Sequence, residues 1–274
     1  MKFIQSLFCC VSVALGLTSG VQAATIKDAG PYSMYAFDSI NYSNASISTG
    51  IYAGESIILT NVSIATGVIP IGNTSLEVIS GGTAVLTNGS VNGSVSYAST
   101  PSSSSSSLSA RATFSQAPSP FILSNEDAYF QALSNALAGL TANATYSQTG
   151  STVILHPIDP NAAAGLFIFN LPTGITTANN LILDLPAGST AIINYQGNGS
   201  FQNGGFQVLN GLSATDIFWN SPTATSVNVS GTALQGTILA PNATVDLENG
   251  SLTGQIIANS VFGGGAQLSF DPYE

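Results

Sequence analysis

One histidine and a few carboxylates are the residues of this sequence that could carry out acid–base chemistry. His156 stands directly before Pro157. A catalytic triad needs a serine and a carboxylate around the histidine, and no G-x-S-x-G elbow occurs in the sequence. We therefore expect His156 to be a loop or turn residue rather than a catalytic base.

A pair of acidic residues, Asp246 and Glu248, is the strongest candidate for chemistry on a polysaccharide. Because they are two residues apart, they would share one face of a β-strand. Enzymes that cleave polysaccharides need clustered carboxylates, often with Ca²⁺ and a basic residue, whereas the other acids here are scattered and Arg111 lies in a serine-rich segment. A single histidine does not make a metal site. The sequence therefore predicts no catalytic, cofactor-binding or metal site, and a polysaccharide-active enzyme is the weakest of the alternatives.

Asn-x-Ser/Thr sequences are more frequent than the composition alone would give, and eleven occur along the chain. In a secreted eukaryotic protein they would be N-glycosylation sites. The alternative is structural, because turns favour asparagine followed by small hydroxyl residues. The candidate asparagines are Asn41, Asn44, Asn61, Asn73, Asn88, Asn92, Asn143, Asn198, Asn228, Asn242 and Asn249.

Hydroxyl and amide side chains alternate with apolar residues between Thr223 and Ser230. Alternate residues of a strand point to the same side of a sheet, so the outward members would form an ordered, uncharged array. Such an array could order water to match ice, could form hydrogen bonds with a glycan or a protein strand, or could be an inert coat. The candidate binding residues are Thr223, Thr225, Asn228 and Ser230.

The element that must carry these side chains is a repeated strand. Residues 233–240 and 251–258 share leucine, glycine, isoleucine, an aliphatic residue and alanine at an offset of 18 residues. A unit of this length is about one turn of a parallel β-solenoid, in which each coil buries its apolar side against the next. A β-sandwich, which also has short alternating strands, is the alternative. In the solenoid, Ile238 and Ile256 must lie stacked on neighbouring strands.

One segment is predicted to be a long helix. Ser124 begins a capping box with acids in the first turn, and apolar residues follow at helical spacing from Phe130 to Leu140. This single apolar stripe would pack along the side of the solenoid. Ahead of it, residues 99–120 are rich in serine and proline and are predicted to be a flexible linker, either plain or O-glycosylated.

The N-terminus has the pattern of a secretory signal peptide, with a membrane anchor as the alternative. Lys2 precedes an apolar run too short to span a bilayer, and residues 21–23 form a small-x-Ala cleavage site. Cleavage would remove both cysteines and so exclude disulfides. The mature chain would keep 13 acids against Lys27 and Arg111, a net charge of −11. We therefore expect neither nucleic acid nor an anionic membrane surface as a partner.

Four motifs follow one another in the second half of the chain, at residues 178–194, 217–220, 234–243 and 252–258. Their order resembles the choice-of-anchor A domain of secreted and surface-attached proteins, some of them regarded as adhesins, and the related ice-binding-protein-like β-solenoids. The resemblance covers roughly residues 125–271. It implies a right-handed parallel β-helix with one helix beside it and no catalytic residues. The serine-rich insertion before the helix departs from the family pattern, and so does the C-terminus, at which we expect no anchor.

These patterns predict an all-β solenoid with one long α-helix packed alongside, and the resemblance implies that the solenoid is a right-handed parallel β-helix. The expected divisions are a signal peptide at 1–23, an N-terminal solenoid part at 24–98, a linker at 99–120, and the helix with the C-terminal solenoid part at 121–274. The expected function is that of a secreted, extracellular adhesive or structural protein, which binds a matrix, cell-wall or surface polymer through a flat uncharged face. An ice-binding protein is the alternative. No cofactor and no membrane insertion are expected.

Overall fold

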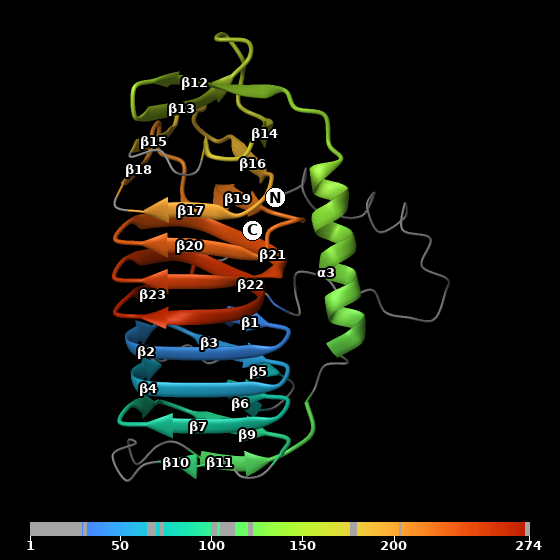
Figure 1. Cartoon of the computed structure of the whole chain (residues 1–274), viewed down its shortest axis with the longest axis vertical. Helices are drawn as coiled ribbons and strands as arrows, with labels where there is room; N and C mark the ends of the chain where they lie inside the picture. The colour runs from blue at the N-terminus through green and yellow to red at the C-terminus, as the bar shows by residue number, and fades with distance from the viewer. Residues whose placement is uncertain are drawn as a thin grey trace.

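The structure, a computed structural model, describes residues 29, 32–64, 70–71, 74–99, 103–104, 113–119, 123–175, 180–202 and 204–271. The predicted signal peptide, Asn73 and Arg111 lie outside these residues. The described part is a parallel sheet wound into a right-handed β-helix, with a four-stranded sheet at one end and one long helix alongside (Figure 1). The predicted fold class is therefore confirmed.

Short strands joined by tight corners form the coils of the β-helix. The N-terminal coils contain β1 (Tyr32–Ala36), β2 (Ser39–Ile47), β3 (Gly50–Ala53), β4 (Ser56–Ile64), β5 (Pro70–Ile71), β6 (Thr74–Ser80), β7 (Thr83–Thr87), β8 (Ser90–Val91), β9 (Ser94–Tyr97), β10 (Ser103–Ser104) and β11 (Thr113–Gln116). The C-terminal coils contain β14 (Leu166–Leu171), β16 (Thr190–Tyr195), β17 (Gly199–Gln202), β19 (Ile217–Asn220), β20 (Ser226–Ser230), β21 (Ala233–Glu248), β22 (Ser251–Gly264) and β23 (Gln267–Ser269).

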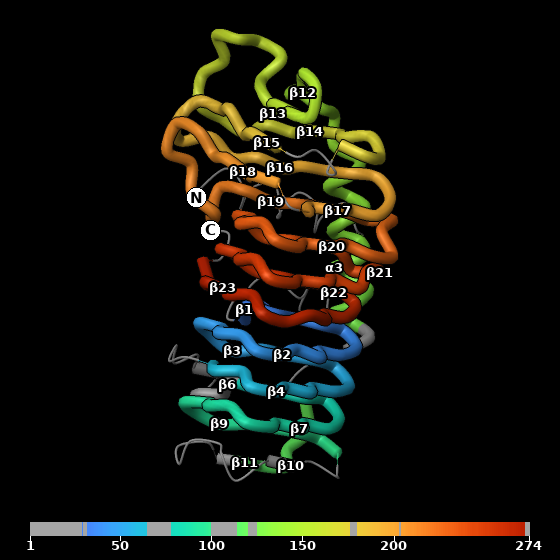
Figure 2. Tube along the Cα trace, turned by 60° about the vertical axis from the view of Figure 1, so that its left-hand side comes forward, coloured from blue at the N-terminus to red at the C-terminus, as the bar shows by residue number. Residues whose placement is uncertain are grey.

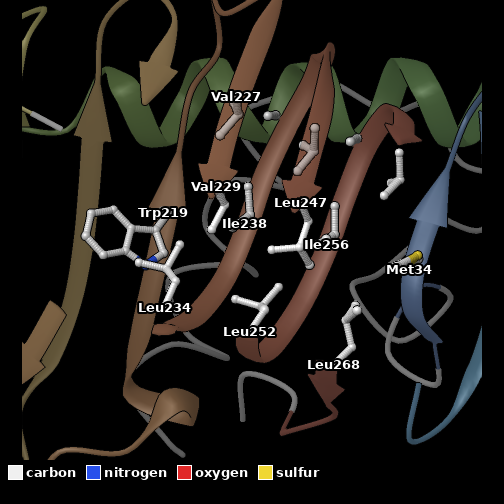
Figure 3. Close-up of a cluster of buried hydrophobic side chains, with 14 of the residues drawn as sticks. Met34, Trp219, Val227, Val229, Leu234, Ile238, Leu247, Leu252, Ile256 and Leu268 are labelled. Carbon is white, nitrogen blue, oxygen red and sulfur yellow. The ribbon is translucent and has the colours of Figure 1, made fainter. Parts of the chain in front are cut away.

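Rows of apolar side chains run through the stack and form its core. Ile238 pairs in parallel register with Ile256, which pairs with Met34 from the other end of the chain, and all three are buried (Figure 3). Neighbouring strands lie about 4.8 Å apart, so each residue rests on its equivalent in the next coil. Burial of one such side chain contributes about 1.5–3 kcal/mol. This register confirms the predicted repeat and excludes the sandwich.

A glycine marks the bend that leads into each of these isoleucine strands. Gly236 and Gly254 pair in register and have φ angles of 109° and 145°. A Cβ atom on Gly254 would collide with the carbonyl oxygen of Gly236. Only glycine combines this backbone conformation with such close approach of two chains.

The coils do not stack in chain order, because the last coil of the chain lies on the first. One strand, β22, pairs with β21 on one side and with β1 and β2 on the other. Figure 2 shows this junction near the middle of the stack, where the red end of the chain lies against the blue beginning. The two solenoid parts predicted from the sequence thus share one continuous core, with Val261 of β22 in register with Ile40 of β2.

The predicted helix is α3 (Leu123–Ala138), which lies along one side of both groups of coils (Figure 1). Phe130, Leu133 and Leu137 are buried on the face that it turns to the sheet. Opposite them lies a row of outward residues from successive strands. This row, the helix-covered side, comprises Leu239, Ile257, Tyr35, Tyr52 and Ile79.

Buried asparagines fasten the C-terminal part of α3 to the coils. Asn194 and Asn220 occupy paired positions on β16 and β19. Asn220 Nδ2 donates to the carbonyl oxygen of Ser134 at 2.9 Å and to Asn194 Oδ1 at 2.7 Å. Asn194 Nδ2 in turn donates to the carbonyl oxygen of Leu137 at 3.0 Å. The two asparagines thus supply side-chain donors to carbonyl groups in the last turns of the helix, and the Leu137 carbonyl oxygen also accepts a hydrogen bond from the Leu140 N–H at 3.2 Å.

Two parts of the architecture differ from the expectations. A hairpin of β12 (Ala144–Thr149) and β13 (Thr152–Pro157) joins β15 (Asn180–Leu183) and β18 (Gly205–Val208) in the four-stranded sheet at the end of the stack. The segment predicted to be a flexible linker also contributes strands, since β10 pairs with β7 and β11 pairs with β9. Phe114 of β11 lies in register with the buried Val95, so an apolar residue within the polar segment extends the core row.

Candidate binding face

The side of the stack that faces the viewer in Figure 1 carries no helix, and we call it the open face. It is formed by β17, β20, the second part of β21 and of β22, β2, β4 and β7, which pair in parallel in that order. In β20, Val227 and Val229 point into the core, while Ser226, Asn228 and Ser230 point outward. The other strands follow the same alternation, except that β17 has only two outward residues and Ser260 of β22 is buried, so the outward positions form three parallel rows.

The four residues predicted to bind lie at two different places. Asn228 and Ser230 are on the open face, where Asn228 pairs with Asp246 and Ser230 with Glu248. Thr223 and Thr225 lie in the loop before β20, outside the sheet. There Thr223 Oγ1 accepts a hydrogen bond from the backbone N–H of Gly197 at 3.3 Å, and Thr225 Oγ1 donates to Asn198 Oδ1 at 3.2 Å. The two threonines join neighbouring coils at a corner, whereas Asn228 and Ser230 belong to the flat array.

The C-terminal half of the open face is acidic. Asp246 and Glu248 project from β21 in adjacent outward rows. Partial burial raises the pKa of Asp246 above its ordinary value, and the nearby Glu248 raises it further. Among the residues that the structure describes, no three His, Cys, Asp or Glu side chains gather closely enough to hold a metal ion.

The N-terminal half of the same face, formed by β2, β4 and β7, has no charged side chain among its outward residues. Serine and threonine fill the two outer rows, and Ile58 and Val85 stand in the middle row, with Ile58 41% exposed. This half was not predicted from the sequence, although Ser56–Thr60 and Thr83–Thr87 alternate in the same way and pair at an offset of 27 residues. The outward residues of this array are Ser39, Asn41, Ser43, Ser56, Ile58, Thr60, Thr83, Val85 and Thr87.

Many of the asparagines in Asn-x-Ser/Thr sequences stabilise the corners of the coils. Asn44, Asn61, Asn88 and Asn249 each turn a corner of the coil with a positive φ of 50° to 55°. Asn61 Nδ2 donates to Asn44 Oδ1 in the next coil at 2.9 Å, so these two corners are linked through their side chains. Asparagine tolerates this left-handed conformation better than other residues with side chains.

The other asparagines of this set divide by position. Asn143, Asn198 and Asn242 form side-chain hydrogen bonds with backbone groups of neighbouring segments. Asn41 and Asn228 lie on the open face, and Asn92 lies in a bend after β8. The structural explanation for the excess of these sequences is therefore sufficient at seven of the ten described positions, and glycosylation of any of them stays a prediction.

His156 is not a loop or turn residue, so that expectation is wrong. It lies within β13, where it pairs with Thr145, and its Nδ1 atom is 2.8 Å from the carbonyl oxygen of Pro157. His156 takes part in the regular pairing of β12 with β13, the hairpin that covers the end of the stack. The proline that follows it had suggested a turn instead. His156 and Asp184 line a depression of about 380 Å³ at that end.

Comparison with known families then identifies the architecture. Residues 25–269 match the family model described as "Putative Ice-binding-like adhesive domain". The chain belongs to this family of ice-binding-like adhesive domains. The predicted resemblance to ice-binding-protein-like β-solenoids is thereby confirmed, while the relation to choice-of-anchor A domains stays a prediction. The family is described by adhesion and not by catalysis, in agreement with the prediction that the protein is not an enzyme.

Two solved structures show the same fold at low sequence identity. A glycosylated ice-binding protein (LeIBP) from an Arctic yeast has a TM-score of 0.53 and 14% identity, with 92% of this chain and 96% of that chain covered. The ice-binding protein of the Antarctic ascomycete Antarctomyces psychrotrophicus has a TM-score of 0.52 and 13% identity, with 91% and 98% covered. A search of curated proteins found no match. Within the described residues, no helix is long and apolar enough to cross a membrane.

Proposed function

We propose that this protein is secreted and binds ice through the N-terminal half of its open face. The observation that carries the proposal is the uncharged array of β2, β4 and β7, in which hydroxyl rows flank the exposed Ile58 and the half-buried Val85. Two solved proteins with this fold are ice-binding proteins by name, which supports the same reading.

The geometry of the array suits a surface of ordered water. Its strands repeat at about 4.8 Å, and outward residues of one strand lie about 6.5–7 Å apart, so hydroxyl groups recur on a fixed lattice. Methyl and methylene groups between them leave water free to order, because they offer no competing hydrogen bonds. Charged groups hold their own hydration water strongly, and the array contains none.

A charge placed in the middle of the array tests the proposal. We expect the purified mature chain to show thermal hysteresis and ice shaping, and Ile58→Lys to lose most of both. Ile58 is 41% exposed, so the substitution should leave the fold intact, which thermal unfolding would verify. The matched control is Gln267→Lys, which adds the same charge at an exposed position past the corner of the coil, away from the open face.

Two results would contradict ice binding through this array. One is the absence of thermal hysteresis and of ice shaping in the unmodified mature chain. The other is an equal loss in Ile58→Lys and Gln267→Lys, which would indicate a general effect of charge on solubility.

Secretion is the part of the proposal that depends on the N-terminus. Residues 1–23 have the pattern of a signal peptide, so the secreted form should begin near Ala24. N-terminal sequencing of that form checks the cleavage site, and retention of Cys9 and Cys10 would show that the segment is not removed.

Adhesion to a surface polymer is the second candidate, and the C-terminal half of the open face favours it. There the array is interrupted by carboxylates at Asp246 and Glu248, which suit hydrogen bonding with a hydroxyl-rich ligand better than contact with ice. A pull-down of the mature chain with collagen, chitin and cellulose beside ice tests this candidate directly.

A further inference from the structure

A shallow depression of about 570 Å³ interrupts the open face where the last coil of the chain meets the first. We propose that it binds a sugar ring of a neutral glycan. The inference rests on the second candidate function, adhesion through the C-terminal half of the open face, and names its class of ligand. It does not depend on ice binding, because the groups that carry it come mainly from β21 and β22.

Glycines form the floor of the depression. In the third outward row, Gly264 stands between Glu248 above and Ser43 below, and Gly265 follows it at the corner. A Cβ atom on Gly264 would lie 2.6 Å from the carbonyl oxygen of Ser43, and one on Gly265 would lie 2.6 Å from Asn249 Oδ1. Ser43 and Asn249 therefore leave no space for a side chain at these two positions, and the floor of the depression is bare backbone where the other strands of the face carry side chains.

An exposed aromatic ring forms one wall. Phe262 is 39% exposed. A phenylalanine that points outward and stays this exposed contributes little to the stability of the fold. It is the only aromatic residue among the described outward positions of the open face. The face of an aromatic ring is electron-rich, and the C–H groups on one side of a hexose ring can stack on it.

Polar groups surround that ring on the remaining sides. Asp246 and Asn41 flank Phe262 in its own row, and Glu248 and Asn249 line the opposite wall. Carboxylates accept hydrogen bonds, and amides both donate and accept them, so together they can satisfy vicinal hydroxyl groups. An apolar platform with a few convergent polar groups is the usual composition of a small-molecule site.

The charges narrow the class of ligand. Two carboxylates would repel a glycan built from uronic acids or sulfated sugars, and the protein as a whole carries a net charge of −10. The two acids are also too few for a metal cage of the usual kind. A neutral hexose or N-acetylhexosamine unit remains as the ligand that fits both the ring and the acids.

The test is a titration of the full mature chain with cellohexaose, chitohexaose and mannohexaose, with oligogalacturonate as the anionic comparison. We expect at least one neutral oligosaccharide to bind, and oligogalacturonate not to bind. Phe262→Ala, and Asp246→Asn combined with Glu248→Gln, should each weaken binding about tenfold or more. Leu209→Ala is the matched control, because Leu209 has the same exposed fraction of 39% and follows β18, outside the open face, so the affinity of this variant should equal that of the parent.

Three outcomes would overturn the proposal. The first is no binding of any neutral oligosaccharide, and the second is equal weakening of binding by Phe262→Ala and Leu209→Ala. The third is binding that disappears with a chelator and returns with Ca²⁺, which would make the carboxylates metal ligands. Thermal hysteresis of the same variants separates this site from ice binding. Phe262→Ala should retain thermal hysteresis if both proposals hold, and the glycan result stands whether or not the protein binds ice.

Discussion

The helix-covered side and the open face are two sides of the same coils with opposite outward residues. On five successive coils the covered row reads Leu239, Ile257, Tyr35, Tyr52 and Ile79. On the same coils the middle row of the open face reads Asp246, Phe262, Asn41, Ile58 and Val85. All members of the first row are buried, whereas Ile58 and Phe262 are about two-fifths exposed. The outward residues therefore decide whether a side of the coils is covered by α3 or stays exposed and able to bind a ligand.

The largest expected effect tests the covered side. Leu133 is fully buried between α3 and the coils. Leu133→Ala should lower the free energy of unfolding by about 2–5 kcal/mol, because it removes apolar contact and leaves a cavity. Urea denaturation would measure the change, and a loss below about 0.5 kcal/mol would mean that the helix is not a stabilising part of the fold.

A smaller loss should follow from the asparagine that ties the helix down. Asn220 is buried and bonds both to α3 and to Asn194. Asn220→Ala should cost about 1–3 kcal/mol, since it leaves buried polar groups without partners. The control is Asn41→Ala, an exposed asparagine of the open face that should change stability by less than about 0.5 kcal/mol. If urea denaturation showed the same loss of unfolding free energy for both variants, the helix-covered side and the open face would not differ in the way proposed.

On the open face, truncation of an aliphatic side chain should matter little for stability. Ile58→Ala should change the free energy of unfolding by no more than about 0.5 kcal/mol, in contrast to Leu133→Ala. A loss of the size expected for a buried leucine would show that Ile58 packs as core, and that the open face is covered by something in the folded protein.

The smallest effect concerns the raised pKa of Asp246. Because its pKa is raised, the Asp246 carboxyl group binds a proton more readily in the folded state than in the unfolded state. The free energy of unfolding therefore falls as the pH rises above 3.8, the ordinary pKa of this carboxyl group. Asp246→Asn should therefore be slightly more stable than the parent at neutral pH, with no difference at about pH 3, where the carboxyl group is protonated in both states. Denaturation curves at the two pH values would show this. A parent more stable than the variant at neutral pH would mean that the ionised carboxylate makes a stabilising contact.

The sequence predicted the parts of the fold that repeat locally. The match of residues 233–240 with 251–258, and the helical stripe from Phe130, were enough for the solenoid and its helix. Pairing of β22 with β1 could not be predicted in the same way, because the two strands are separated by most of the chain and share no motif. The site was predicted only in part, because Asn228 and Ser230 lie in an alternating run, whereas the depression at Phe262 depends on glycines whose neighbours come from another coil.

The junction between the last coil and the first also sets the order in which the chain can fold. During synthesis, β1 and β2 emerge long before β22, which pairs with them. Until residues 251–264 are available, the N-terminal coils present an open parallel edge that can add strands from another molecule. Closing a contact across more than 200 residues also carries a large loop-closure entropy, so we expect slow, late formation of this junction. Dilute conditions or a chaperone should therefore raise the yield of refolded protein more than they would for a solenoid stacked in chain order.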